Sequence, residues 1–145
     1  MPNILVDTGF WIGLCDPKDN LESKDEIKNI YEKVVIHRVI IPWPVSYETL
    51  RTGFVKKRMA LELFERELKS TRVELFDDAP YRQDAMELSF NSTRKGRPLS
   101  MVDCLLRLMM DDVKNRINYF VTLNVRDFAD VCRKRSIELW SPWPM

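Results

Sequence analysis

The chain has 145 residues, of which 45% are apolar and 31% are charged, a composition that excludes a disordered chain. Its 23 lysines and arginines nearly balance its 22 acids, so a net charge of +1 gives no overall field that would draw it to nucleic acid or to a membrane. We expect one soluble globular domain spanning residues 1–145, in which any polyanion is held by local basic patches.

Targeting signals and cysteine motifs also favour an ordinary cytoplasmic protein. No basic segment precedes the first apolar run and Asp7 interrupts that run early, which argues against a signal peptide. The most apolar later stretch, residues 34–42, contains His37 and Arg38 and is too short to span a bilayer. Three cysteines without zinc-type spacing are expected as small buried residues: Cys15, Cys104 and Cys132. His37 is the only histidine, which argues against His-based catalysis and His-rich metal sites.

Short apolar runs alternate with segments of helical spacing along the chain. The first run, Ile4-Leu5-Val6, has no polar alternation and predicts a strand buried on both faces. Further strands are predicted at residues 39–41, 72–76, 118–122 and 137–140. Helices are predicted from residue 10 and at residues 21–35, 45–51, 54–69, 80–90, 100–113 and 127–135, with a break at Gly53 and a loop at residues 91–98. This alternation predicts an α/β fold with a mainly parallel sheet.

Polar side chains follow two of the predicted strands. Asp7 comes directly after the first strand, and Asn124 and Asp127 follow the strand at residues 118–122. In open α/β sheets, ligands bind in the crevice at the carboxyl ends of parallel strands. The alternative is that each of these side chains only caps the helix that follows it.

Two further acids are predicted at helix starts that face the same edge of the sheet, Glu48 and Asp103. Glu48 could instead complement a helix dipole, and Ser100 with Asp103 resembles a capping box. Acids crowded together hold their protons more tightly unless a cation lies between them. Mg²⁺ or Mn²⁺ suits such oxygen ligands and could activate water for an in-line phosphoryl displacement.

These residues resemble the PIN-domain nucleases, in segments distributed from end to end of the chain. The matching segments are Val6-Asp7-Thr8-Gly9-Phe10, Asp16-Pro17-Lys18-Asp19, Ser46-Tyr47-Glu48, Ser100-Met101-Val102-Asp103 and Val121-Thr122-Leu123-Asn124-Val125-Arg126-Asp127-Phe128. The resemblance implies a three-layer α/β sandwich with a central, mainly parallel sheet and a Mg²⁺- or Mn²⁺-dependent endoribonuclease, often a homodimer. It assigns metal-binding and catalytic roles to Asp7, Glu48 and Asp103.

One position departs from that family pattern. Where the family commonly has a fourth acid two residues after Thr122, this chain has Asn124. An amide oxygen can bind a metal or orient its water, but it adds no negative charge and holds a second cation less well. We therefore expect Asn124 as a weaker ligand, with Asp127 helping from the next turn, and two-metal chemistry is in doubt while one-metal chemistry is not.

RNA would have to be held by local groups. Three basic clusters stand out: Lys56-Lys57-Arg58, Arg94-Lys95-Gly96-Arg97 and Arg133-Lys134-Arg135. Each could be a solvated face, and the glycine-containing one is favoured, which makes Arg94, Lys95 and Arg97 the expected contacts. Thr8, Arg51 and Arg107 are expected near substrate, the two arginines touching phosphate or pairing with the acids. Phe10, Trp11 and Trp43 could stack on bases, but core or dimer packing is the favoured role.

Three functions compete. The leading hypothesis is a PIN-class endoribonuclease, the toxin of a VapC-type toxin–antitoxin pair with an antitoxin protein as partner. The second, motivated by Asn124, is a catalytically weak or silent PIN-like module that binds RNA or protein. The third is a phosphotransferase with Asp7 as nucleophile, as in dehalogenase-like phosphatases. It ranks last because those enzymes usually carry a second aspartate where this chain has Gly9.

Overall fold

A sheet of five parallel strands runs through the computed structural model, which describes residues 2–143. The strands are β1 (Asn3–Val6), β2 (Arg38–Pro42), β3 (Val73–Phe76), β4 (Ile117–Val121) and β5 (Glu138–Trp140). They lie in the order β3-β2-β1-β4-β5, so β1 is central. Ile4 of β1 pairs with Val39 of β2 on one side and with Tyr119 of β4 on the other.

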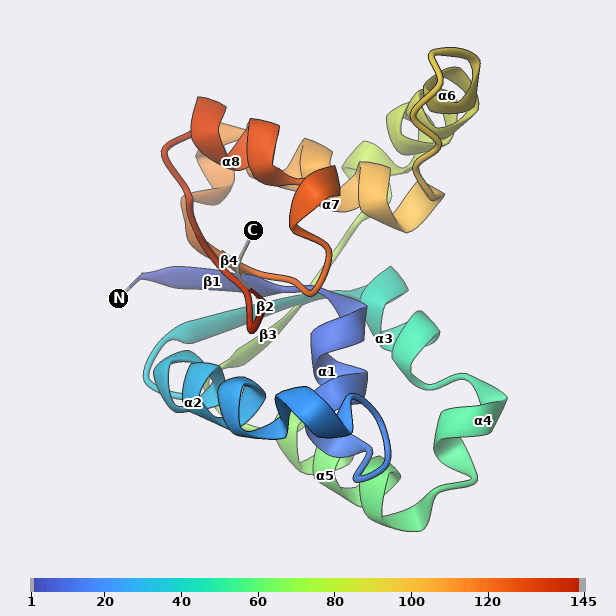
Figure 1. The fold of residues 1–145 in the computed structure, drawn as a ribbon. Helices are drawn as coiled ribbons and strands as arrows, with labels where there is room; N and C mark the ends of the chain where they lie inside the picture. Colours follow the sequence, from blue (N-terminus) through green and yellow to red (C-terminus); the bar gives the residue numbers. More distant parts are fainter. Residues whose placement is uncertain (1, 144–145) are drawn as a thin grey trace.

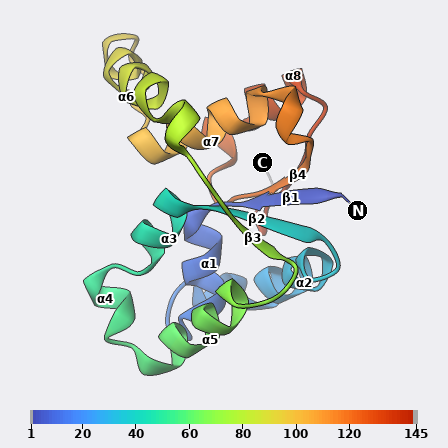
Figure 2. The same cartoon turned by 180° about the vertical axis from the view of Figure 1, so that it is seen from behind.

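Helices cover both faces of this sheet (Figure 1). They are α1 (Thr8–Cys15), α2 (Lys24–Val34), α3 (Trp43–Thr49), α4 (Thr52–Val55), α5 (Arg58–Leu68), α6 (Ala79–Arg94), α7 (Met101–Asp111) and α8 (Ala129–Lys134). Short 3-10 turns occur at η1 (Leu21–Ser23), η2 (Val113–Asn115) and η3 (Val125–Asp127). α1 packs against α2, α3 and α5 on one face, while α7 packs against α6 and α8 on the other, as the reverse view in Figure 2 also shows. The predicted α/β fold with a parallel sheet is therefore confirmed.

The strand order reverses between β1 and β4. The chain first steps outward from β1 to β2 and β3, and then returns across the sheet to β4 and β5. Because parallel crossovers are right-handed, steps in opposite directions place their helices on opposite faces. The carboxyl ends of β1 and β4 thus form a topological switch point, where open α/β sheets bind their ligands.

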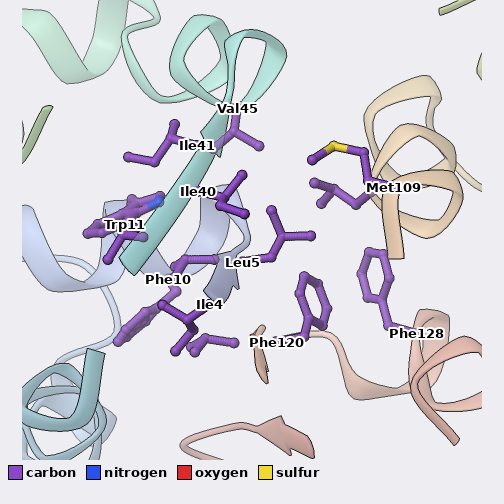
Figure 3. Packing of buried hydrophobic residues seen from close by; sticks show 14 of the residues in the cluster. Ile4, Leu5, Phe10, Trp11, Ile40, Ile41, Val45, Met109, Phe120 and Phe128 are labelled. Carbon is purple, nitrogen blue, oxygen red and sulfur yellow. The ribbon is translucent and has the colours of Figure 1, made fainter. Parts of the chain in front are cut away.

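The core fills both faces of the central strands, which explains their uninterrupted apolar sequences. Figure 3 shows Phe10 and Trp11 of α1 on one side of the strands and Met109 of α7 with Phe128 on the other. All four are fully buried, and the Phe128 ring meets that of Phe120 edge to face at 4.8 Å. The expectation of core packing for Phe10 and Trp11 is confirmed, and neither ring is exposed to stack on a base. Trp43 is 42% exposed beside Tyr47.

The three cysteines are buried and free, as expected. Across residues 2–143, every helix is either too short or too polar to cross a bilayer.

Two predicted boundaries are wrong. Gly53 does not break a helix but lies inside α4, and the breaks fall instead at residues 50–51 and 56–57. The predicted loop at residues 91–98 begins later, because α6 continues to Arg94. Ser92 is buried there, and its hydroxyl donates to Ser89 O and accepts from Leu99 N, which fixes the last turn against the following segment. Gly96, with φ +78°, then ends the helix.

Candidate active site

Asp7 directly follows β1 and caps α1. Its backbone N–H donates to Val121 O at 2.9 Å, which extends the pairing of β1 with β4. One carboxylate oxygen accepts from Thr8 N at 2.7 Å, so the capping interpretation is correct. The other accepts from the Thr122 hydroxyl at 2.9 Å. The carboxylate therefore faces the switch point as well as its own helix.

Thr122 joins the two strands at this point, a role that the sequence did not reveal. The residue is fully buried just beyond β4, and its Oγ1 donates to Asp7 and accepts from Asn124 N at 2.9 Å. A single hydroxyl thus orients Asp7 and the backbone that leads to Asn124. The one signal in the sequence is a polar residue closing an apolar strand.

Glu48 lies near the end of α3, so its predicted place at a helix start is wrong. α3 begins at Trp43 with Pro44 in its first turn, because proline is well tolerated where helix N–H groups have no partner. The first-turn dipole interpretation is therefore also wrong. Glu48 nevertheless reaches the switch point, where its Oε1 accepts a hydrogen bond from the Thr8 hydroxyl at 2.6 Å.

Asp103 lies in the first turn of α7, as predicted. Ser100 caps this helix, its hydroxyl accepting from Asp103 N at 3.0 Å, so one half of the predicted capping box is present. The Asp103 side chain is half-buried.

The charges of these acids act on one another. Burial raises the pKa of Asp7 to about 6; the charges of Asp103 and Glu48 add to the rise, and the hydrogen bonds from Thr122 and Thr8 oppose it. Burial also raises the pKa of Asp103, with Asp127 and Glu48 contributing. Asp7, which follows β1, therefore shares one negative region with acids of α3, α7 and η3.

Asn124 precedes η3 and Asp127 is its last residue, and neither side chain caps the helix that follows. α8 begins after Phe128, so the capping alternative is wrong for both residues. The Asn124 amide donates to Asp127 Oδ2 at 2.5 Å and so directs one carboxylate oxygen.

The residues expected near substrate do not lie together in the structure. Arg51 lies with Thr8 and Glu48 in a cleft of about 490 Å³. Arg97 and Arg107 instead share Asp130 as an ion-pair partner.

The remaining two expected contacts lie at the end of α6, the helix that projects from the sheet in Figure 1. Arg94 donates to Asn91 at 2.8 Å, and Lys95 is exposed.

The other two basic clusters are partly engaged in ion pairs. Lys57 pairs with Asp16, and Lys134 and Arg135 pair with Asp111.

Whether a metal ion fits this site depends on its donors. Within residues 2–143, no set of three or more histidine, cysteine, aspartate or glutamate side chains is placed to hold a metal together. The donors are nevertheless hard oxygens, and burial, with a smaller contribution from neighbouring acids, raises the pKa of both Asp7 and Asp103. Mg²⁺ commonly binds through one or two carboxylates and keeps several waters. The side chains at the switch point therefore have the donor chemistry that such an ion prefers.

Comparison with solved structures identifies the fold, whereas comparison of sequences finds no relative. No protein-family model matches the sequence, and no curated protein matches it. Among solved structures, the chain is similar to a chain of VapBC2 from Rickettsia felis, determined bound to a DNA fragment from its promoter. The TM-score is 0.62 at 19% identity, over 98% of this chain and 99% of that chain. The chain therefore has the PIN-like three-layer α/β fold that its sequence motifs predicted.

Proposed function

We propose that the protein is a divalent-metal-dependent endoribonuclease that hydrolyses RNA phosphodiester bonds. The observation that carries this proposal is the shared negative region at the switch point, formed by Asp7, Glu48, Asp103 and Asp127. The likeness to VapBC2 supports a more specific assignment, the toxin of a VapC-type pair. An antitoxin protein is then the expected partner and a homodimer the expected assembly.

Asp7, Glu48 and Asp103 would hold Mg²⁺ or Mn²⁺. Asn124 would be a weaker ligand through its amide oxygen, and Asp127 an outer helper. When bound, the ion supplies an activated water and stabilises the charge that develops on the phosphate.

Two threonines prepare the acids for this task. Thr122 and the Thr8 N–H fix the two oxygens of Asp7, while the Thr8 hydroxyl fixes Glu48. Ligands held in this way lose little freedom when they bind an ion. Arg51, in the cleft that Thr8 and Glu48 line, offers a cation for an RNA phosphate, and Arg94 and Lys95 are proposed as outlying contacts.

The test is cleavage of RNA by wild type and Asp7→Asn, with and without Mn²⁺. We expect Mn²⁺-dependent cleavage by wild type and at least a 100-fold loss in the variant, because a central ligand is lost, an effect on the order of that seen for catalytic groups. Asp84→Asn is the matched control, since Asp84 is exposed on α6 and its side chain makes no hydrogen bond or ion pair within residues 2–143. Unchanged cleavage by Asp7→Asn would overturn the proposal.

A second candidate is a PIN-like module that binds RNA or protein without cutting. Asn124 favours it, because the site has an amide where the family pattern has an acid. Calorimetric titration with Mn²⁺ separates the two candidates. Binding that Asp7→Asn abolishes supports the nuclease, whereas no binding at millimolar Mn²⁺ supports the silent module.

A further inference from the structure

Two arginines hold the short turn that carries Asn124 and Asp127. Arg97 donates to Arg126 O at 3.0 Å, and Arg107 donates to Asp127 O at 2.7 Å. Both carbonyl groups belong to the three-residue turn η3. A turn this short satisfies few of its own carbonyl groups, so these donors supply bonds that the local backbone does not.

Asp130 orients both arginines. Arg107 forms a fork on its carboxylate, with NH1 to Oδ1 at 2.7 Å and NH2 to Oδ2 at 2.8 Å. Arg97 approaches the same two oxygens at 3.4 and 3.5 Å. The two guanidinium groups hold the pKa of Asp130 well below its usual range. Each arginine therefore contacts one carbonyl of η3 and the same carboxylate of α8.

Arg107 connects this arrangement to the candidate active site. It lies one helical turn beyond Asp103 on α7, so its guanidinium links the helix that bears Asp103 to the turn that bears Asp127. Its side chain is only 18% exposed, against 43% for Arg97. A group this enclosed, with its donors already directed at Asp127 O and Asp130, is poorly placed to bind an RNA phosphate.

We propose that Arg97 and Arg107 are positioning residues, which use Asp130 to hold η3 and so set Asn124 and Asp127 against Asp103. The consequence for the site rests on the proposed metal-dependent function. We call Arg97, Arg107 and Asp130 the η3 clamp. Within this clamp Arg107 holds η3 more firmly than Arg97 does, since its contacts are shorter and more buried. Lysine cannot replace it, because an ammonium group lacks the planar fork that reaches a carbonyl and both carboxylate oxygens together.

The first measurement needs no metal. Amide hydrogen exchange is compared in wild type, Arg107→Lys and Asp130→Asn, with Arg82→Lys as control, because Arg82 of α6 forms a similar fork on Asp78, the residue before that helix. We expect faster exchange at residues 124–128 in the first two variants and no change there in the control. Unchanged exchange at these residues would overturn the clamp, and a thermal melt of each variant checks that it is folded.

The second measurement separates positioning from phosphate binding. If the two arginines position η3, both variants should bind Mn²⁺ on the order of 10-fold more weakly in calorimetry. Their kcat for RNA cleavage should also fall, with little change in KM. A phosphate contact predicts instead that Arg107→Lys raises KM and that Asp130→Asn, by freeing two arginines, tightens RNA binding. That second pattern would refute the positioning role.

The two measurements also separate this inference from the proposed function. If wild type neither binds Mn²⁺ nor cleaves RNA, the proposed function fails, and exchange at residues 124–128 still decides whether the clamp exists. If wild type binds Mn²⁺ and the variants bind it equally well, the positioning role fails while the nuclease assignment stands.

Discussion

Asp7 shows how one side chain can have a structural and a chemical role at once. It caps α1 through Thr8 N, yet the same carboxylate receives the Thr122 hydroxyl and lies within the influence of Asp103 and Glu48. A residue needed only as a cap would normally be placed where water can solvate its charge. Asp7 is instead buried enough to raise its pKa to about 6.

The raised pKa of Asp7 predicts how stability depends on pH in the metal-free protein. The folded state binds a proton that the unfolded state releases near its usual pKa of 3.8, so the contribution of Asp7 to stability is fully present below pH 4 and is lost as pH rises through about 6. Asp7→Asn removes this loss, and we expect it to raise the free energy of unfolding at pH 7.5 by about 3 kcal/mol. Urea unfolding of wild type and Asp7→Asn in EDTA at pH 4.5, 6 and 7.5 measures this difference in the free energy of unfolding.

The matched control for this pH prediction is again Asp84→Asn, which should follow wild type at every pH because Asp84 is exposed. A pH dependence of the Asp7→Asn variant parallel to that of wild type would show that Asp7 is not the group responsible. Added Mn²⁺ should reduce the difference between wild type and the variant, since a bound cation compensates the carboxylate charge.

Among the elements, α7 depends most visibly on a single cap. Ser100 precedes it with extended backbone and accepts from Asp103 N. Ser100→Ala should lower the free energy of unfolding by about 1 kcal/mol, because that N–H loses its partner. Urea unfolding tests this, with Ser100→Thr as the control that keeps the hydroxyl. Equal stability of the alanine and threonine variants would contradict the capping role.

Helix ends were the part of each element that the sequence predicted least well. The types of the elements followed from periodicity. Pro42 and Pro44, however, were taken only as the end of a strand, although they also mark the start of α3. Glu48 was therefore predicted at a helix start and lies near the helix end. Gly53 was taken as a break although α4 tolerates it. Proline and glycine each suit more than one position in a chain, so the local pattern alone did not decide between these alternatives.

The role of Thr122 at the site could not be predicted from the sequence either. Its hydroxyl matters only because β1 and β4 are neighbours, and Asp7 lies 115 residues away in sequence. Asp7 and Asp103 could be proposed from the sequence because a strand end and a helix start mark them, whereas Glu48 was proposed from a helix start that the structure does not have. The clamp on η3 was not found, since Arg97, Arg107 and Asp130 meet only through the packing of α7 against α8.

At the scale of the whole molecule, the strand order decides where the site can lie. The sequence predicts parallel strands without their order, and several orders would satisfy the same alternation of helix and strand. The observed order makes β1 the central strand, with β4 beside it, and this brings Asp7 next to Thr122 and close to η3. Central strands are buried on both faces, whereas the edge strand β3 is only partly buried.

This difference between central and edge strands can be tested by matched substitutions. Leu5 of β1 is fully buried and Leu75 of β3 is 38% exposed. Leu5→Ala should lower the free energy of unfolding by about 3–4 kcal/mol, because it removes packing and leaves a cavity, whereas Leu75→Ala should cost about 1 kcal/mol, since much of its side chain is already in water. Urea unfolding with a common m-value measures both. Similar losses for the two variants would contradict the central position of β1, and with it the placement of Asp7 at the switch point.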